Sequence, residues 1–123
     1  MKNVKDQVAD ALATVTENVS DSYPTDWATF PAIQYVEENN AVYDRTDEGR
    51  ETLAKVGYRI DIWDDKSTSQ AALDVDAAVA SLGLVRTFCQ DVPEPGQRLK
   101  HKVMRYEGII SMDDDFVYWN FNH

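Results

Sequence analysis

Apolar residues near the start of the chain recur at steps of three and four positions, the spacing that places side chains on one face of an α-helix. The residues on this face would be Val4, Val8, Ala11, Leu12, Val15 and Val19. The same spacing returns between residues 71 and 82, where alanine and valine predominate. The pattern therefore predicts two amphipathic helices, and the small side chains of the second would let it lie close against a sheet.

Both ends of the second helix carry recognisable signals. Ser67 and Gln70 have the spacing of a capping box, in which Ser67 would accept a hydrogen bond from the Gln70 amide and the Gln70 side chain would return one. Gly83 stands where a residue in the left-handed conformation commonly follows the last turn of a helix. We therefore expect this helix to start close to Ser67 and to end before Gly83.

Alternation of apolar and polar residues is clearest in residues 56–64. The apolar residues of this strand would share one face, while Arg59 and Asp61 would point to the other. Residues 32–37 and 41–44 also have strand propensity, and the polar turn between them predicts a hairpin. The remaining predicted strands cover residues 84–91, 99–112 and, at the aromatic end of the chain, 116–121.

These elements follow the order α-β-β-β-α-β-β, with one further short strand if the aromatic end pairs with the sheet. Alternating strands suit an antiparallel sheet that has one face covered and one face in water. No internal repeat, linker or low-complexity stretch divides the 123 residues. The sequence therefore predicts a single α+β domain over residues 1–123, with a mainly antiparallel sheet and two helices packed on one face.

The formal net charge of −10, from 22 acidic and 12 basic residues, narrows the class of partner. Nucleic-acid binding and docking on anionic membranes both need basic residues at the contact, so neither is expected as the main function. The first residues lack the apolar core of a signal peptide, and no apolar stretch reaches the length of a transmembrane helix. We therefore expect a protein that is made in the cytosol.

Residues with catalytic potential are few and scattered. Cys89, the one cysteine, falls inside a predicted strand and is expected to be a buried structural thiol. His101 stands among basic residues without a carboxylate close in sequence, which indicates an exposed histidine on a strand edge rather than a member of a triad. The aspartates at 113–115 fit no EF-hand spacing, and no CxxC or HExxH motif occurs. We therefore expect no enzyme activity, no metal site and no cofactor.

Two loops are candidates for contacts with other proteins. The first covers residues 20–31, whose Tyr23, Trp27 and Phe30 would either pin the loop to the core or anchor a partner. The second is the polar segment 45–51, which is expected to be exposed and mobile. Its charged candidate residues are Arg45, Asp47, Glu48 and Arg50.

A third segment, residues 98–105, opposes the charge of the whole chain because four basic residues and His101 fall within it. These charges would protect a strand edge against unwanted pairing, or they would meet the acidic surface of a neighbouring copy. The candidate residues of this segment, together with two aromatic residues near the end of the chain, are Arg98, Lys100, Lys102, Trp119 and Phe121.

Three stretches, in order along the chain, resemble segments of a known protein family. The first runs from Tyr23-Pro24 in the aromatic loop through residues 30–40, the second is residues 58–63 ahead of the small-residue helix, and the third is residues 99–110. Together they resemble the tail-completion and minor tail proteins of phages with long tails. The aromatic segment 116–121 has no counterpart in the pattern of that family.

The resemblance implies a virion structural protein with the fold of the lambda-type tail terminator. Such proteins form a hexameric ring that completes the tail tube and joins it to the head connector, so the implied partners are further copies, the tube protein and the connector protein. The genome would pass through the ring without specific binding, and acidic residues on the lumen would repel its phosphates. The ring would be assembled in the cytoplasm of the bacterial host.

The residues by themselves leave two other functions open. One is another minor tail or neck protein of a prophage, which would differ in whether it binds the tube end or the connector. The other is a small acidic intracellular protein-binding domain that is unrelated to phages.

Overall fold

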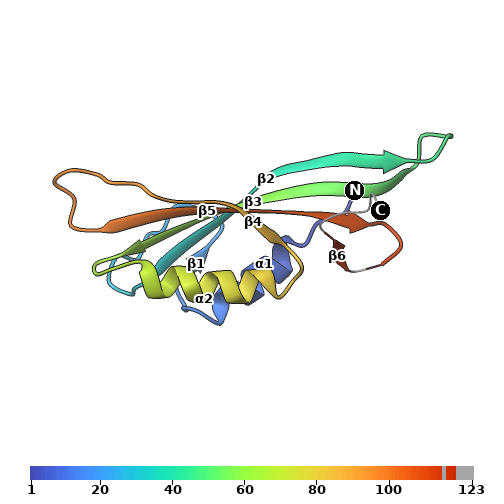
Figure 1. The fold of residues 1–123 in the computed structure, drawn as a ribbon. Coiled ribbons are helices and arrows are strands. Elements are labelled where there is room, and N and C mark those ends of the chain that lie inside the picture. The colour runs from blue at the N-terminus through green and yellow to red at the C-terminus, as the bar shows by residue number, and fades with distance from the viewer. Residues whose placement is uncertain (115, 119–123) are drawn as a thin grey trace.

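The computed structural model describes residues 1–114 and 116–118 of the chain (Figure 1). Within these residues, two helices and six strands follow one another in the order α-β-β-β-α-β-β-β. The elements are α1 (Lys5–Ala13), β1 (Val19–Ser20), β2 (Ala32–Arg45), β3 (Glu51–Asp64), α2 (Ser69–Ala80), β4 (Val85–Asp91), β5 (Lys100–Ser111) and β6 (Val117–Tyr118). The predicted order, including the optional last strand, is confirmed.

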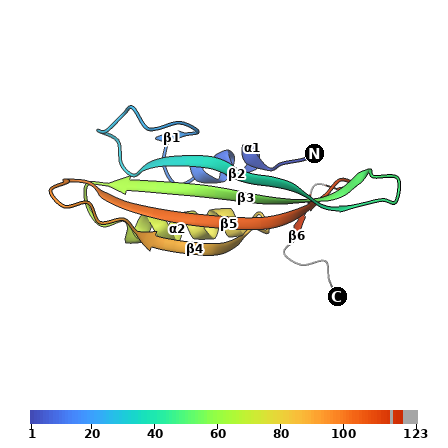
Figure 2. The same ribbon diagram turned by 90° about the horizontal axis from the view of Figure 1, so that it is seen from above.

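The strands form one sheet, in the order β1-β2-β3-β5-β4, with β6 paired to β5. Every pairing is antiparallel except the one between β1 and β2. Both described helices lie on the same face of the sheet, and neither of them covers the opposite face (Figures 1 and 2). The predicted α+β class, with two helices on one face of a mainly antiparallel sheet, is therefore confirmed.

The core lies between the sheet and the helices, where the alternation predicted for β3 places four apolar side chains. These fully buried residues are Val56, Tyr58, Ile60 and Ile62. The helices add Val8, Leu12, Val75 and Val79 to the same cluster. Burying one such side chain stabilises a fold by about 1.5–3 kcal/mol, more than a typical exposed ion pair contributes. This apolar layer is therefore the main source of stability.

Helix α1 is shorter than the predicted helix. It ends at Ala13, and Val19, which was expected on its last turn, lies in β1. The intervening residues include the β-branched Thr14, Val15 and Thr16, whose side chains lose rotamer freedom in a helix. Val15 and Val19 still pack against the core, so the apolar spacing indicated burial correctly but not the secondary structure.

The hairpin predicted around Glu38-Asn39-Asn40 is wrong, because β2 continues through this segment. Its pairing with β3 shifts register between Glu37 and Asn39 and again between Val42 and Asp44. A β-bulge adds a residue to one strand without ending it. The polar residues that resemble a turn are therefore accommodated as an irregularity within one long strand.

The loop predicted over residues 45–51 is reduced to a turn of residues 46–50. Arg45 and Glu51 are partners in the β2–β3 ladder, the Thr46 amide donates to the Arg50 carbonyl at 2.8 Å, and the Gly49 amide donates to the Thr46 carbonyl at 2.9 Å. These hydrogen bonds close a hairpin turn whose residues are exposed as expected, and the mobility of the segment stays a prediction.

The capping box predicted for α2 is wrong. Thr68 is the N-cap and its side chain makes no capping bond, so Ser67 stands one position too early. The Ser67 hydroxyl accepts a hydrogen bond from the Ser69 amide at 3.1 Å, and the Gln70 side chain donates to Asp74 at 3.0 Å. The Ser67–Gln70 spacing of a capping box is present, but the helix starts one residue later than that motif requires.

Gly83 has the left-handed conformation predicted for it, but it lies two residues beyond Ser81, the C-cap of the second helix. Its φ of +94° is left-handed, which side chains with a Cβ atom rarely adopt. The site is also crowded, since a Cβ built on Gly83 would lie 2.6 Å from the Val117 carbonyl oxygen of β6. Glycine is therefore required here by both conformation and space.

Candidate functional site

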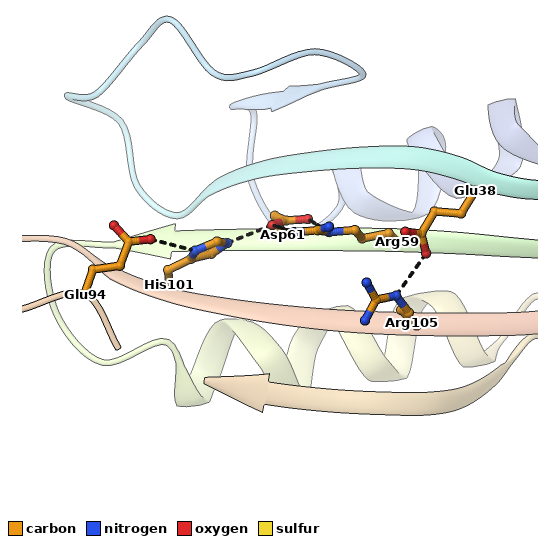
Figure 3. A network of polar contacts seen from close by, with 6 residues as sticks. All are labelled: Glu38, Arg59, Asp61, Glu94, His101 and Arg105. Carbon is orange, nitrogen blue, oxygen red and sulfur yellow. Dashed lines mark hydrogen bonds and ion pairs between the residues drawn. The ribbon is translucent and has the colours of Figure 1, made fainter. Parts of the chain in front are cut away.

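The uncovered face of the sheet carries a group of polar side chains at its centre (Figure 3). Arg59 and Asp61 of β3 point to this face, as the alternation predicts. In the antiparallel register of β3 and β5, Arg59 stands opposite Arg105 and Trp63 stands opposite His101. Charged residues from two strands that are distant in sequence are therefore brought together.

Asp61 is nearly buried, with 4% of its surface exposed. Its carboxylate accepts hydrogen bonds from Arg59 Nε at 2.8 Å and Arg59 Nη2 at 3.0 Å, and its Oδ2 lies 2.7 Å from His101 Nε2. A buried carboxylate needs such partners, because desolvation penalises an unpaired charge heavily. The hydrogen bonds with Asp61 also raise the pKa of the Arg59 guanidinium above its ordinary value.

His101 lies between two carboxylates, contrary to the expectation of an exposed histidine without one. In addition to its contact with Asp61, its Nδ1 lies 3.4 Å from Glu94 Oε1, and only 11% of the side chain is exposed. Its ring stacks on Trp63, with 4.5 Å between centroids and 14° between planes. The sequence around His101 gave no sign of Asp61, because strand register alone brings the two together.

Arg105 connects the two sides of the same face. Its Nε donates to Glu38 of β2 at 3.0 Å, and its guanidinium lies 4.9 Å from the centre of the Phe88 ring of β4. Because β3 stands between β2 and β5 in the sheet, these contacts span four neighbouring strands. Sequence reasoning missed Glu38 and Phe88 as members of this group, since Glu38 was assigned to a turn.

The aromatic loop packs against the end of the uncovered face. The rings of Tyr23, Trp27 and Trp63 contact one another with centroid separations of 5.4, 5.5 and 5.6 Å. Phe30, the third aromatic candidate, has the Arg98 guanidinium 5.8 Å from its ring centre. Tyr23 nevertheless remains 63% exposed. The rings therefore pin the loop, and Tyr23 keeps an exposed apolar surface.

A hollow of about 450 Å³ opens above the polar group, with Tyr23 and Trp63 among its walls and Asp61 and His101 also lining it. A second hollow, of about 620 Å³, lies between the start of α2 and the connection from β4 to β5. In the first hollow the Asp61 carboxylate and both His101 nitrogens already contact side chains of the same chain. It therefore offers a shaped polar surface whose charged groups already have partners within the chain.

The basic residues predicted as one cluster are divided between the two faces of β5. Successive strand residues alternate in direction. Lys100 and Lys102, the register partners of Asp64 and Ile62, lie on the helix side, whereas His101 lies on the uncovered side. The sequence cluster is therefore not one patch.

Salt bridges further reduce the basic character of this segment. Lys102 Nζ lies 2.9 Å from Asp91 Oδ1, and Arg98 Nη1 lies 4.0 Å from Asp65 Oδ2. Lys100 is exposed and forms no ion pair within the described part of the chain. It is therefore the candidate of this segment whose charge is most available to another protein.

The charged candidates of the second loop lie at the far end of the β2–β3 hairpin, which extends beyond the helices, away from the β4–β5 connection (Figures 1 and 2). These residues are Arg45, Asp47, Glu48 and Arg50, and all four are exposed. Beside them on β2, Val42 and Tyr43 are 58% and 39% exposed. The structure therefore does not bring the hairpin end together with the aromatic loop or the basic segment.

Cys89 is exposed on β4, so the expectation of a buried thiol is wrong. The sheet order places β4 at an edge, where only β5 adjoins it. The position of Cys89 inside a predicted strand suggested burial, but its side chain lines an open hollow beside Leu73 of α2 and stays exposed. The candidates Trp119 and Phe121 lie outside the described residues.

Within residues 1–114 and 116–118, no group of three or more His, Cys, Asp or Glu side chains is arranged to hold a metal ion. None of the helices in this part of the chain is long and apolar enough to cross a membrane. No protein-family model matches the chain, and no curated protein shows significant similarity to its sequence. Its function is therefore inferred from its own residues and geometry.

Proposed function

We propose that the chain is a structural protein of a phage virion, which completes the tail tube and joins it to the head connector by forming a ring of copies. The ring is hexameric in the family that the sequence resembles. The partners are further copies, the tube protein and the connector protein, and the genome passes through the ring without specific binding. Assembly takes place in the cytoplasm of the bacterial host.

The observation that carries this proposal is the far end of the β2–β3 hairpin. This end extends beyond the helices, and it exposes 58% of Val42 and 39% of Tyr43 (Figure 1). Large apolar side chains grouped on a projecting element are typical of surfaces that another protein covers. A projecting hairpin of this kind lets a small subunit contact a neighbour in an assembly.

The uncovered face of the sheet also supports assembly over catalysis. A general base must present a nitrogen or oxygen to its substrate. Here the Asp61 carboxylate and both His101 nitrogens are engaged by side chains of the same chain. Aromatic residues and arginine, which are enriched at protein contact surfaces, are both present on this face, as Tyr23, Trp63 and Arg105 show.

Deletion of the gene from the phage or prophage that encodes it tests the proposal directly. Electron microscopy of the lysate should find separate full heads beside overlong or unjoined tails. Supplying the wild-type chain from a plasmid should restore joined particles, which excludes effects on neighbouring genes. Intact infectious particles in the deletion lysate would contradict the proposal and favour the unrelated acidic binding domain.

A further inference from the structure

The sheet has two outer edges that are largely without a neighbour. On one side, β1 covers only the first part of β2, through the pairs Val19–Ile33 and Ser20–Gln34. Beyond Gln34, β2 has no strand on its outer side among the described residues. On the other side, β4 pairs with β5 alone within the part of the chain that the structure describes.

Free edges of this kind invite pairing with another chain, because each presents unpaired backbone donors and acceptors. Proteins that stay monomeric commonly block an edge with proline, lysine or bulges. Strand β4 contains neither proline nor lysine, and its one register shift lies between Arg86 and Phe88. Residues 88–91 therefore form a regular free edge of four residues.

The free part of β2 contains a matching stretch. Its register shifts fall before Asn39 and after Val42, so residues 39–42 pair regularly with β3. This stretch is also four residues long, and three of its residues are exposed. The two edges can therefore form a short regular ladder with each other.

Charge distinguishes pairing of unlike edges from pairing of like edges. The side of the sheet that includes β1 and β2, residues 17–45, contains six acidic residues and one basic residue. The opposite side, residues 85–91 and 98–105, contains five basic residues and one acidic residue. The five basic residues are Arg86, Arg98, Lys100, Lys102 and Arg105.

Four of the five basic residues have acidic partners within the chain: Arg86 with Asp76, Arg98 with Asp65, Lys102 with Asp91, and Arg105 with Glu38 of the opposite side. Exposed charges without an ion pair among the described residues include Lys100 on one side and Asp44 on the other. Attraction between these opposite charges favours contacts that run head to tail. Contacts of that kind generate a ring when the rotation between copies closes.

We propose that the β4 edge of one copy pairs with the free β2 edge of the next, so that the sheet continues from subunit to subunit around the ring. This inference rests on the proposed function and names the surfaces by which copies join. Residues 88–91 and 39–42 are the facing stretches. The partner is a second copy of this chain, and the helices of all copies lie on the same side of the continuous sheet.

Cys89 makes this contact measurable, because it is the one cysteine of the chain and lies exposed within the β4 stretch. A disulfide needs Cα atoms within about 7 Å, so a second cysteine reports direct strand pairing. The variants Asn40→Cys and Val42→Cys, made singly, scan the register, because these two side chains, like that of Cys89, lie on the helix side of the sheet. Each is supplied to the deletion phage, and oxidised particles are analysed on non-reducing gels.

At least one of these variants should give cross-linked species larger than dimers, because every copy carries both halves of the pair. These species should disappear when Cys89→Ser is added to the same variant. Glu48→Cys is the matched control, since Glu48 is exposed at the turn of the β2–β3 hairpin and belongs to neither stretch. It should give no such series.

Cross-linked dimers of the wild-type chain through Cys89 would mean that like edges pair, and they would overturn the proposal. Cross-links from Cys89 to the tube or connector protein would assign the β4 edge to another partner, with the same consequence. Particles that hold several copies without any cross-link would overturn edge pairing and leave the proposed function intact. Infectious particles that lack the chain would contradict both the edge pairing and the proposed function.

Discussion

Asp61 and His101 stand 40 positions apart in sequence, yet the Oδ2 of one lies 2.7 Å from the Nε2 of the other. The antiparallel register of β3 and β5 brings them together, and the stacking of Trp63 on the imidazole holds the ring in place. With Arg59 and Glu94 they form a continuous polar chain on the uncovered face of the sheet (Figure 3).

The first prediction concerns this chain of contacts. Asp61→Asn preserves size but removes the negative charge that Arg59 and His101 share. We expect the free energy of unfolding to fall by about 2 kcal/mol, since both partners then keep only part of their hydrogen bonding. Urea denaturation measures this loss. Asp47→Asn, at the exposed hairpin turn, is the matched control and should change stability by less than about 0.5 kcal/mol. Equal effects of the two substitutions would contradict the structural role of Asp61.

The second prediction concerns alkaline pH. Burial raises the pKa of Tyr58, and burial together with a 2.7 Å hydrogen bond to Asp76 raises the pKa of Tyr106. Above about pH 10 the unfolded chain loses protons from these hydroxyls that the folded chain retains. The free energy of unfolding should therefore fall as the pH rises beyond this value.

Urea midpoints measured between neutral and strongly alkaline pH test this expectation. The double variant Tyr58→Phe with Tyr106→Phe should be less stable at neutral pH, because each lost hydrogen bond costs about 1 kcal/mol. Its stability should then decline less steeply at alkaline pH than that of the wild type. Parallel declines would mean that these hydroxyls do not control the alkaline transition.

The third prediction compares two glycines that share a left-handed backbone. Gly49 has a φ of +88° with open space around it, whereas Gly83 has a φ of +94° and lies against Val117. Gly49→Ala should cost about 1 kcal/mol of unfolding free energy from backbone strain. Gly83→Ala should cost about 3 kcal/mol, because the added Cβ also displaces β6. Thermal or urea unfolding measures both, and equal losses would argue against the contact with Val117.

The fourth prediction concerns the projecting hairpin. Val42→Asp should leave the unfolding free energy within about 1 kcal/mol of the wild type, since this side chain is 58% exposed. It should nevertheless prevent joined particles from forming, because a charge replaces an apolar contact. Leu73→Asp places the same charge at an equally exposed apolar site on α2. Restoration of infectious particles by both variants would exclude the hairpin from the assembly contacts.

The fifth prediction concerns the exposed charge of Lys100. Lys100→Glu should weaken association between copies, and added salt should reduce the difference from the wild type because screening acts on exposed charges. Lys66→Glu, at another exposed lysine, is the control for net charge. Sedimentation of assembled material at two salt concentrations measures the effect. Equal losses from the two variants would point to total charge rather than to the β4–β5 side.

Local patterns predicted much of this fold because they report what a short segment can bury. The alternation in β3 identified the face that contacts the helices, and the small residues of α2 identified its buried stripe. The prediction of a turn at residues 38–40 failed because the same polar residue types occur in β-bulges and in turns. The capping box failed because a shift of one residue in the start of α2 removes the geometry that its spacing requires.

The sequence by itself determined the α+β class and the apolar layer, because periodicity and burial are properties of neighbouring residues. Only the tertiary structure decided which polar residues meet. The sheet order placed β3 beside β5, which brought Asp61 to His101, and it left β2 and β4 at the edges, which exposed Cys89. Strand register is set by the packing of the whole sheet, so no local segment carries that information.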